Sequence, residues 1–124
     1  MITLDGPISA ESSGKLLGDL YSAESVQKAL QQAEKDDSVK GVLLRINSPG
    51  GTVAMSQEIY NTILRIRKDK PVTVSMADVA ASGGYYIASA ADRIIASPGT
   101  LTGSIGVIFN TLEIKTLADK LGVS

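Results

Sequence analysis

Two glycine-rich segments place small residues where a predicted strand gives way to a predicted helix: Ser48-Pro-Gly-Gly51 and Ala80-Ala-Ser-Gly-Gly84. In open α/β folds, ligands and substrates bind at junctions of this kind. Glycines there tolerate positive φ and let a substrate approach the backbone, whose amides can bind an anion or a developing oxyanion. The simpler interpretation of the first segment, a tight turn without a ligand, stays open.

Ser82 is the candidate nucleophile because it lies between small residues in the second segment. This layout is similar to a nucleophile elbow, in which a sharp turn presents the serine hydroxyl and the amide of the next residue donates to the oxyanion. The match to G-x-S-x-G is incomplete, since Ala80 replaces the first glycine. The alternative, that Ser82 caps the helix and its neighbours pack closely, also stays open.

The chain contains no histidine and no cysteine. It therefore cannot supply a Ser-His-Asp triad, an imidazole base, a thiolate nucleophile or a metal site built on these residues, and we expect no cofactor and no metal. The base left for a serine nucleophile is a lysine whose pKa is lowered by burial. Lys115 and Lys120 lie on the polar face of a predicted amphipathic helix, so we expect the base to be missing from this chain.

Ser104 lies in a third glycine-flanked segment, Thr102-Gly-Ser-Ile-Gly106. A serine in such a turn can orient a partner side chain. The alternative role is hydrogen bonding within the turn itself.

The elements that position these residues follow from the spacing of apolar side chains. Short apolar runs predict strands at residues 2–4, 41–46, 72–76, 93–96 and 105–109. Apolar residues three or four apart predict helices at residues 23–36, 53–68 and 112–121, with a further helix within residues 80–91 after Gly83-Gly84. Strands that alternate with helices predict an α/β fold with a mainly parallel sheet. The nearly continuous apolar run 42–46 predicts a strand buried on both faces.

Composition excludes several classes of protein. The formal net charge is −1, from 12 Lys+Arg and 13 Asp+Glu, so no basic excess is present to bind nucleic acid. We expect no leader sequence before the first strand, and no apolar run in these 124 residues reaches the roughly 20 residues of a membrane span. We therefore expect one soluble domain over residues 1–124.

Four motifs identify a family resemblance. They are Val39-Lys-Gly-Val-Leu-Leu-Arg-Ile-Asn-Ser-Pro-Gly-Gly51, Ala80-Ala-Ser-Gly-Gly-Tyr-Tyr-Ile-Ala88, Ala91-Asp-Arg-Ile94 and Leu101-Thr-Gly-Ser-Ile-Gly-Val107. Together and in this order they resemble the signal peptide peptidase A family, Ser-Lys membrane peptidases of the Clp/crotonase-like superfamily. The resemblance extends from Leu4-Asp-Gly-Pro-Ile8 to Leu117-Ala-Asp-Lys-Leu-Gly-Val123, nearly the whole chain.

The resemblance implies a Clp/crotonase-like fold of ββα units and a role for each matching residue. Ser82 matches the nucleophile, and Ser104 matches the serine that orients the lysine. Gly51 and Gly83 match the positions whose amides form the oxyanion hole. The family's lysine falls beyond residue 124, or comes from another repeat in double-length members. We therefore expect residues 1–124 to be a single peptidase core domain, a fragment that lacks the N-terminal anchor and the C-terminal segment and is inactive alone.

The function implied by the resemblance is a serine endopeptidase that degrades cleaved signal peptides and other apolar, membrane-derived peptides. The family also implies a homo-oligomer at the cell membrane, attached through a segment absent from this chain, with the catalytic domain on the extracytoplasmic side. Because the lysine is missing, the alternative is a scaffold of the same fold that binds apolar peptides without cutting them. A third possibility is an acyl-CoA enzyme of the crotonase type, in which Ser82 has no obvious use.

Overall fold

The computed structural model describes residues 1–9 and 21–104. Strands and helices alternate along this part of the chain, in the order β1 (Ile2–Asp5), α1 (Ala23–Lys35), β2 (Val42–Ser48), α2 (Val53–Ile66), β3 (Val72–Ala81), α3 (Gly83–Ala88), β4 (Arg93–Ile95) and β5 (Leu101–Gly103). Every strand pair among these elements is parallel, which confirms the predicted α/β class. The predicted elements at 105–109 and 112–121, with Lys115 and Lys120, lie outside the described residues, and the single domain over residues 1–124 stays a prediction.

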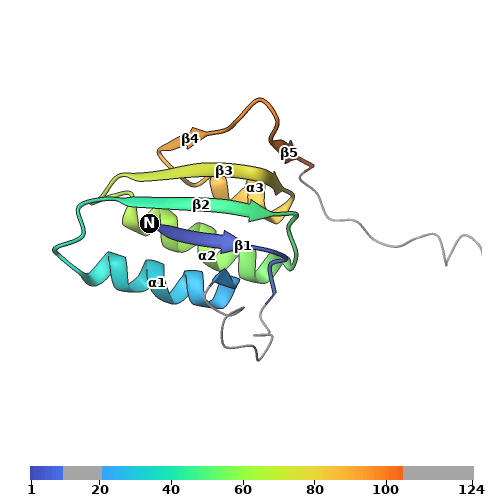
Figure 1. Ribbon diagram of the computed structural model, residues 1–124. Coiled ribbons are helices and arrows are strands. Elements are labelled where there is room, and N and C mark those ends of the chain that lie inside the picture. The colour runs from blue at the N-terminus through green and yellow to red at the C-terminus, as the bar shows by residue number, and fades with distance from the viewer. Residues whose placement is uncertain (10–20, 105–124) are drawn as a thin grey trace, which may run out of the picture.

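The sheet has the order β1-β2-β3-β4, and β5 also pairs with β3. Strand β4 pairs with residues 73–75 and β5 with residues 79–81, so the two short strands follow one another along the edge of β3 opposite β2 (Figure 1). Because all strands run in the same direction, their C-terminal ends share one rim of the sheet. That rim gathers the segments that follow β1, β2, β3 and β5.

The helices cover one face of the sheet (Figure 1). Burial in β2 alternates accordingly: Val42, Leu44 and Ile46 are buried against the helices, whereas Leu43 and Arg45 are exposed on the opposite face. The prediction that residues 42–46 are buried on both faces is therefore wrong for the described residues. The physical reason is that no described element packs on the second face, so this parallel strand alternates like a half-buried one.

The predicted helices α1 and α2 form with nearly the predicted ends. The side chain of Ser22 caps α1 by accepting a hydrogen bond from the Ser25 amide at 3.2 Å. The core consists of apolar side chains from both layers, among them Leu4, Val26, Leu30, Leu44, Ile46, Ile59, Ile63, Ile66, Val72 and Val74. Their spacing of three or four in the helices and of two in the strands explains why the sequence folds into these two layers.

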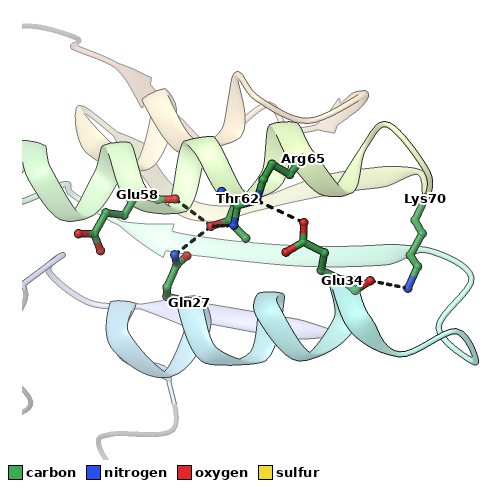
Figure 2. A network of polar contacts seen from close by, with 6 residues as sticks. All are labelled: Gln27, Glu34, Glu58, Thr62, Arg65 and Lys70. Atoms are coloured by element: carbon green, nitrogen blue, oxygen red, sulfur yellow. Dashed lines mark hydrogen bonds and ion pairs between the residues drawn. The ribbon is translucent and has the colours of Figure 1, made fainter.

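Polar side chains join α1 to α2 at the surface of this core (Figure 2). The Gln27 side-chain amide donates to Thr62 Oγ1 at 2.9 Å, and the Thr62 hydroxyl donates to the Glu58 carbonyl at 3.0 Å. Arg65 pairs with Glu34 at 3.3 Å. These contacts hold α2 in place, and α2 begins directly after the first glycine-rich segment.

The largest departure from the predicted elements surrounds Ser82. Strand β3 continues to Ala81 rather than ending at Met76, and the helix within residues 80–91 is short, the six residues of α3. The reason is β5, which was not predicted at residues 101–103 and which pairs with the last three residues of β3. Ser82 therefore stands at the junction between a strand and a helix.

None of the helices within residues 1–9 and 21–104 combines the length and the hydropathy that crossing a bilayer requires.

Candidate active site

The two glycine-rich segments meet at the rim of the sheet. A β-carbon built on Gly50 would lie 2.8 Å from Ser82 Cβ, 2.9 Å from Gly83 N and 3.1 Å from the Ala81 carbonyl oxygen. Gly50 also has a φ of +105°, which disfavours any other residue. The turn after β2 therefore packs directly on the turn after β3, and only glycine permits this approach.

Ser82 has an unusual backbone conformation, with φ 53° and ψ −118°. Two hydrogen bonds maintain it: the Ser82 amide donates to the Gly103 carbonyl at 2.8 Å, and the Tyr86 amide donates to the Ser82 carbonyl at 2.9 Å. A non-glycine residue in such a sparsely populated region is strained by about 1–3 kcal/mol. A strained serine between a strand and a helix is the local geometry of a nucleophile elbow.

The capping alternative for Ser82 is not what the structure shows. Ser82 occupies the N-cap position of α3, but within the described residues its hydroxyl makes no capping hydrogen bond to the helix. The side chain is half-buried at the rim. The hydroxyl is thus not used to stabilise the helix end, as a structural serine at this position would be.

Position 83 favours glycine because Ser56 leaves little space for a side chain there. A β-carbon at this position would lie 2.5 Å from Ser56 Oγ, and the buried Ser56 is itself held by a hydrogen bond from its hydroxyl to the Thr52 carbonyl at 2.8 Å. Gly83 is also the first residue of α3, so its amide has no acceptor within the helix. That amide can donate to a ligand beside Ser82.

Gly51 is held by a bridge to Ile8 in the segment after β1. The Ile8 amide donates to the Gly50 carbonyl and the Thr52 amide donates to the Ile8 carbonyl, both at 2.9 Å. In a parallel ladder of this kind the amide of the intervening residue points away from the partner strand. The Gly51 amide is therefore not used by the bridge, and the residue is exposed. A β-carbon on Gly51 would overlap the Ile8 backbone.

Ser104 is the last described residue of this rim. It has a positive φ of 59° and is exposed. It directly follows Gly103, the residue whose carbonyl accepts the Ser82 amide. The structure thus brings Ser104 within one residue of the backbone partner of Ser82.

Among residues 1–9 and 21–104, no lysine hydrogen-bonds Ser82. Lys28 pairs with Glu24 at 3.5 Å, and Lys40 donates to the Asp37 carbonyl at 3.0 Å. Lys70 donates to backbone carbonyls at the end of α1. The described rim thus holds a nucleophile candidate and amides beside it, and no described lysine hydrogen-bonds its serine.

Two residues of the rim were not singled out from the sequence. Gly50, not its neighbour Gly51, makes the contact with Ser82, and Ile8 supports Gly51 from outside both glycine-rich segments. The two consecutive glycines at positions 50 and 51 are the sequence feature that could have pointed to Gly50. For Ile8, that feature is the Asp5-Gly6-Pro7 segment directly before it.

Comparisons with known proteins show that this chain is similar to peptidases. The model of peptidase family S49 matches residues 65–124. A putative signal peptide peptidase SppA from Enterococcus faecium is 39% identical over 125 residues, which cover 99% of this chain and 36% of that protein. Protease 4 from Haemophilus influenzae is 40% identical over 121 residues, 97% of this chain and 18% of that protein. The chain thus spans about a third or less of these relatives.

The fold also has solved counterparts. ClpP1 from Listeria monocytogenes superposes with a TM-score of 0.65 at 26% identity, covering 99% of this chain and 72% of that one. The predicted Clp-like architecture is therefore confirmed.

Proposed function

Since this chain belongs to peptidase family S49, as the family model and the curated relatives show, we propose that it is the core of a serine endopeptidase with Ser82 as nucleophile. The contact between Gly50 and Ser82 is the observation that carries the proposal. It joins a strained serine, whose hydroxyl does not cap its helix, to the turn that presents the Gly51 amide. A turn with only a structural role needs neither a strained serine nor a serine hydroxyl that leaves its helix uncapped.

In the proposed reaction, Ser82 Oγ attacks the scissile carbonyl while a neutral lysine Nζ accepts the hydroxyl proton. The lysine comes from sequence beyond residue 124 or from a neighbouring copy, and Ser104 orients it. The same lysine then protonates the leaving amine as the C–N bond breaks, which leaves an acyl ester on Ser82. Water hydrolyses that ester with the lysine again as base.

The amides of Gly51 and Gly83 stabilise the tetrahedral oxyanion in both steps. Each well-placed donor of this kind lowers the barrier by about 3 kcal/mol. Support comes from the Ile8 bridge, which leaves the Gly51 amide unused, and from the position of Gly83 at the start of α3. Because both donors belong to the backbone, they need no reorganisation during the reaction.

Cleaved signal peptides and other apolar peptides are the proposed substrates. The Enterococcus faecium relative is named a putative signal peptide peptidase. In this chain, Val53 and Leu101 are 59% and 68% exposed and lie two residues from Gly51 and Gly103. Apolar side chains exposed next to both halves of the site suit an apolar peptide.

Membrane attachment through sequence outside this chain, an extracytoplasmic catalytic domain and self-association complete the proposal. Exposed Leu43 and Ile95 on the open face of the sheet support self-association, because apolar side chains on a sheet face favour burial against another surface.

The deciding experiment compares the full-length gene product with its Ser82→Ala variant on an apolar peptide. Loss of cleavage in Ser82→Ala is expected. The matched control is Ser75→Ala, which removes a half-buried hydroxyl from β3, the strand before Ser82, and should leave the rate unchanged. Equal cleavage by wild type and Ser82→Ala contradicts the assignment of the nucleophile.

A scaffold that binds apolar peptides without cutting them is the second candidate. It is favoured by one observation, that no described lysine hydrogen-bonds Ser82. Peptide binding without any Ser82-dependent cleavage by the full-length gene product supports the scaffold over the peptidase.

A further inference from the structure

The strand that ends at Ser82 is irregular. Strands β2 and β3 pair regularly from Val42 with Val72 to Ile46 with Met76, but the next pair is Ser48 with Ala80. Two steps along β2 are thus matched by four steps along β3. Strand β3 therefore contains a bulge of two extra residues within Ala77–Val79, just before Ser82.

Side chains on both sides of β3 supply hydrogen bonds to this bulge and to Ala80, the residue that follows it. Asn47 Oδ1 in β2 accepts from the Val79 amide at 3.3 Å. On the other side, the Thr100 hydroxyl donates to the Ala77 carbonyl at 2.9 Å, and the Thr102 hydroxyl in β5 donates to the Ala80 carbonyl at 2.7 Å. Backbone groups that lose their ladder partners in a bulge need such substitutes.

On both sides of the bulge, the even-numbered residues of β3 face the core. The buried ones are Val72, Val74, Met76 and Ala80. Asp78 is also even-numbered but lies in the bulge and is exposed, so its charge stays out of the core. Because the insertion is an even number of residues, the alternation resumes at Ala80 in its original phase. The last three residues of β3 then pair with β5, and Ser82 follows them.

We propose that Asn47 and Thr102 are positioning residues that fix the register of residues 79–81 and thereby hold Ser82 against Gly50. The proposal rests on the proposed function, in which Ser82 is the nucleophile. Only Ala80 and Ala81 lie between Val79 and Ser82, and the Ser82 amide itself ends the ladder on the Gly103 carbonyl. A shift of this segment along β2 or β5 moves Ser82 away from the Gly50 turn and from the amides beside it.

The test uses four variants of the full-length gene product. Asn47→Ala removes the acceptor and Thr102→Val removes the hydroxyl, whereas Asn47→Asp and Thr102→Ser keep an oxygen at each place. Matched controls are Asn61→Ala on the exposed surface of α2 and Thr73→Val in the regular part of β3. The readouts are kcat and KM on an apolar peptide, and hydrogen exchange of the amides at residues 79–82 without substrate.

Asn47→Ala and Thr102→Val should lower kcat by about 10- to 100-fold with KM changed by less than about threefold, because a misplaced nucleophile slows chemistry more than binding. Exchange at residues 79–82 should become faster in both. Asn47→Asp and Thr102→Ser should restore most of kcat, and both controls should match the wild type.

Wild-type kcat with wild-type exchange in Asn47→Ala and Thr102→Val overturns the proposal, as does a lower melting temperature with unchanged kcat. Cleavage that persists in Ser82→Ala contradicts the proposed function instead. Hydrogen exchange at residues 79–82 needs neither substrate nor an active nucleophile. Even if the proposed function is contradicted, unchanged exchange in Asn47→Ala and Thr102→Val therefore overturns the positioning role.

Discussion

Gly50 packs on Ser82 so closely that a β-carbon at position 50 would lie 2.8 Å from the β-carbon of Ser82. This contact joins the turn after β2 to the turn after β3, which are 32 residues apart in sequence. It makes the position of the nucleophile candidate depend on a residue that supplies no side chain. The predictions below test this relationship and the contacts around it.

Gly50→Ala should reduce both stability and activity. The new methyl group meets Ser82 Cβ and the Gly83 amide nitrogen, and alanine is strained at the Gly50 φ of +105°. We expect a loss of about 2–4 kcal/mol in the free energy of unfolding and at least a tenfold fall in kcat. Urea unfolding and peptide hydrolysis measure the two effects.

The matched control is Gly99→Ala, where a β-carbon meets nothing within 4 Å. It should change stability by less than about 0.5 kcal/mol. A Gly50→Ala protein as stable and active as Gly99→Ala contradicts the close contact.

Gly83→Ala should destabilise the fold because its new methyl group meets the Ser56 hydroxyl, and removing that hydroxyl should recover part of the loss. Its β-carbon would lie 2.5 Å from Ser56 Oγ but 3.5 Å from Ser56 Cβ. We expect a loss of about 1–3 kcal/mol for Gly83→Ala. The double variant with Ser56→Ala should recover at least about 1 kcal/mol relative to the sum of the single changes, as measured by chemical unfolding. Strict additivity argues against the Ser56 contact as the cause.

Ser82→Gly should be more stable than Ser82→Ala. Both variants lack the hydroxyl and should be inactive, but only glycine relaxes at φ 53° and ψ −118°. The difference in the free energy of unfolding should be about 1 kcal/mol in favour of glycine. Equal melting temperatures for the two variants indicate that the turn is not strained.

Lys70→Met should lower stability without lowering kcat. The Lys70 ammonium donates to the Ala33 carbonyl at 2.5 Å and to the Asp36 carbonyl at 2.7 Å. It also donates to the Glu34 carbonyl at 3.4 Å (Figure 2), and so caps the C-terminal end of α1. We expect a loss of about 1–2 kcal/mol, since a cation and its hydrogen bonds are removed from a helix C-terminus. Thermal unfolding measures it, with the exposed Lys68→Met as control. A loss of activity that exceeds the loss of folded protein contradicts a purely structural role.

Helices and candidate residues were predictable because their signals are local. The spacing of Val26, Leu30 and Ala33 predicted α1, and all three are buried. Ser82 and its glycine neighbours likewise stood out as a strand-to-helix turn from five consecutive residues. The motifs that resemble the signal peptide peptidase A family lie in the same segments. The roles of Ser104, Gly51 and Gly83 stay predictions until the variants above are measured.

The sequence by itself determined the alternation of strands and helices, the absence of histidine and cysteine, and the small residues that permit close turns. Only the tertiary structure decided that β3 continues to Ala81, that its bulge is held by Asn47 and Thr102, and that Gly50 meets Ser82. The physical reason is the distance along the sequence over which each interaction acts. Periodicity and turn preference act within a few residues. The pairing of Val79 with Leu101 and the contact of Gly50 with Ser82 instead join segments that become neighbours only when the sheet assembles.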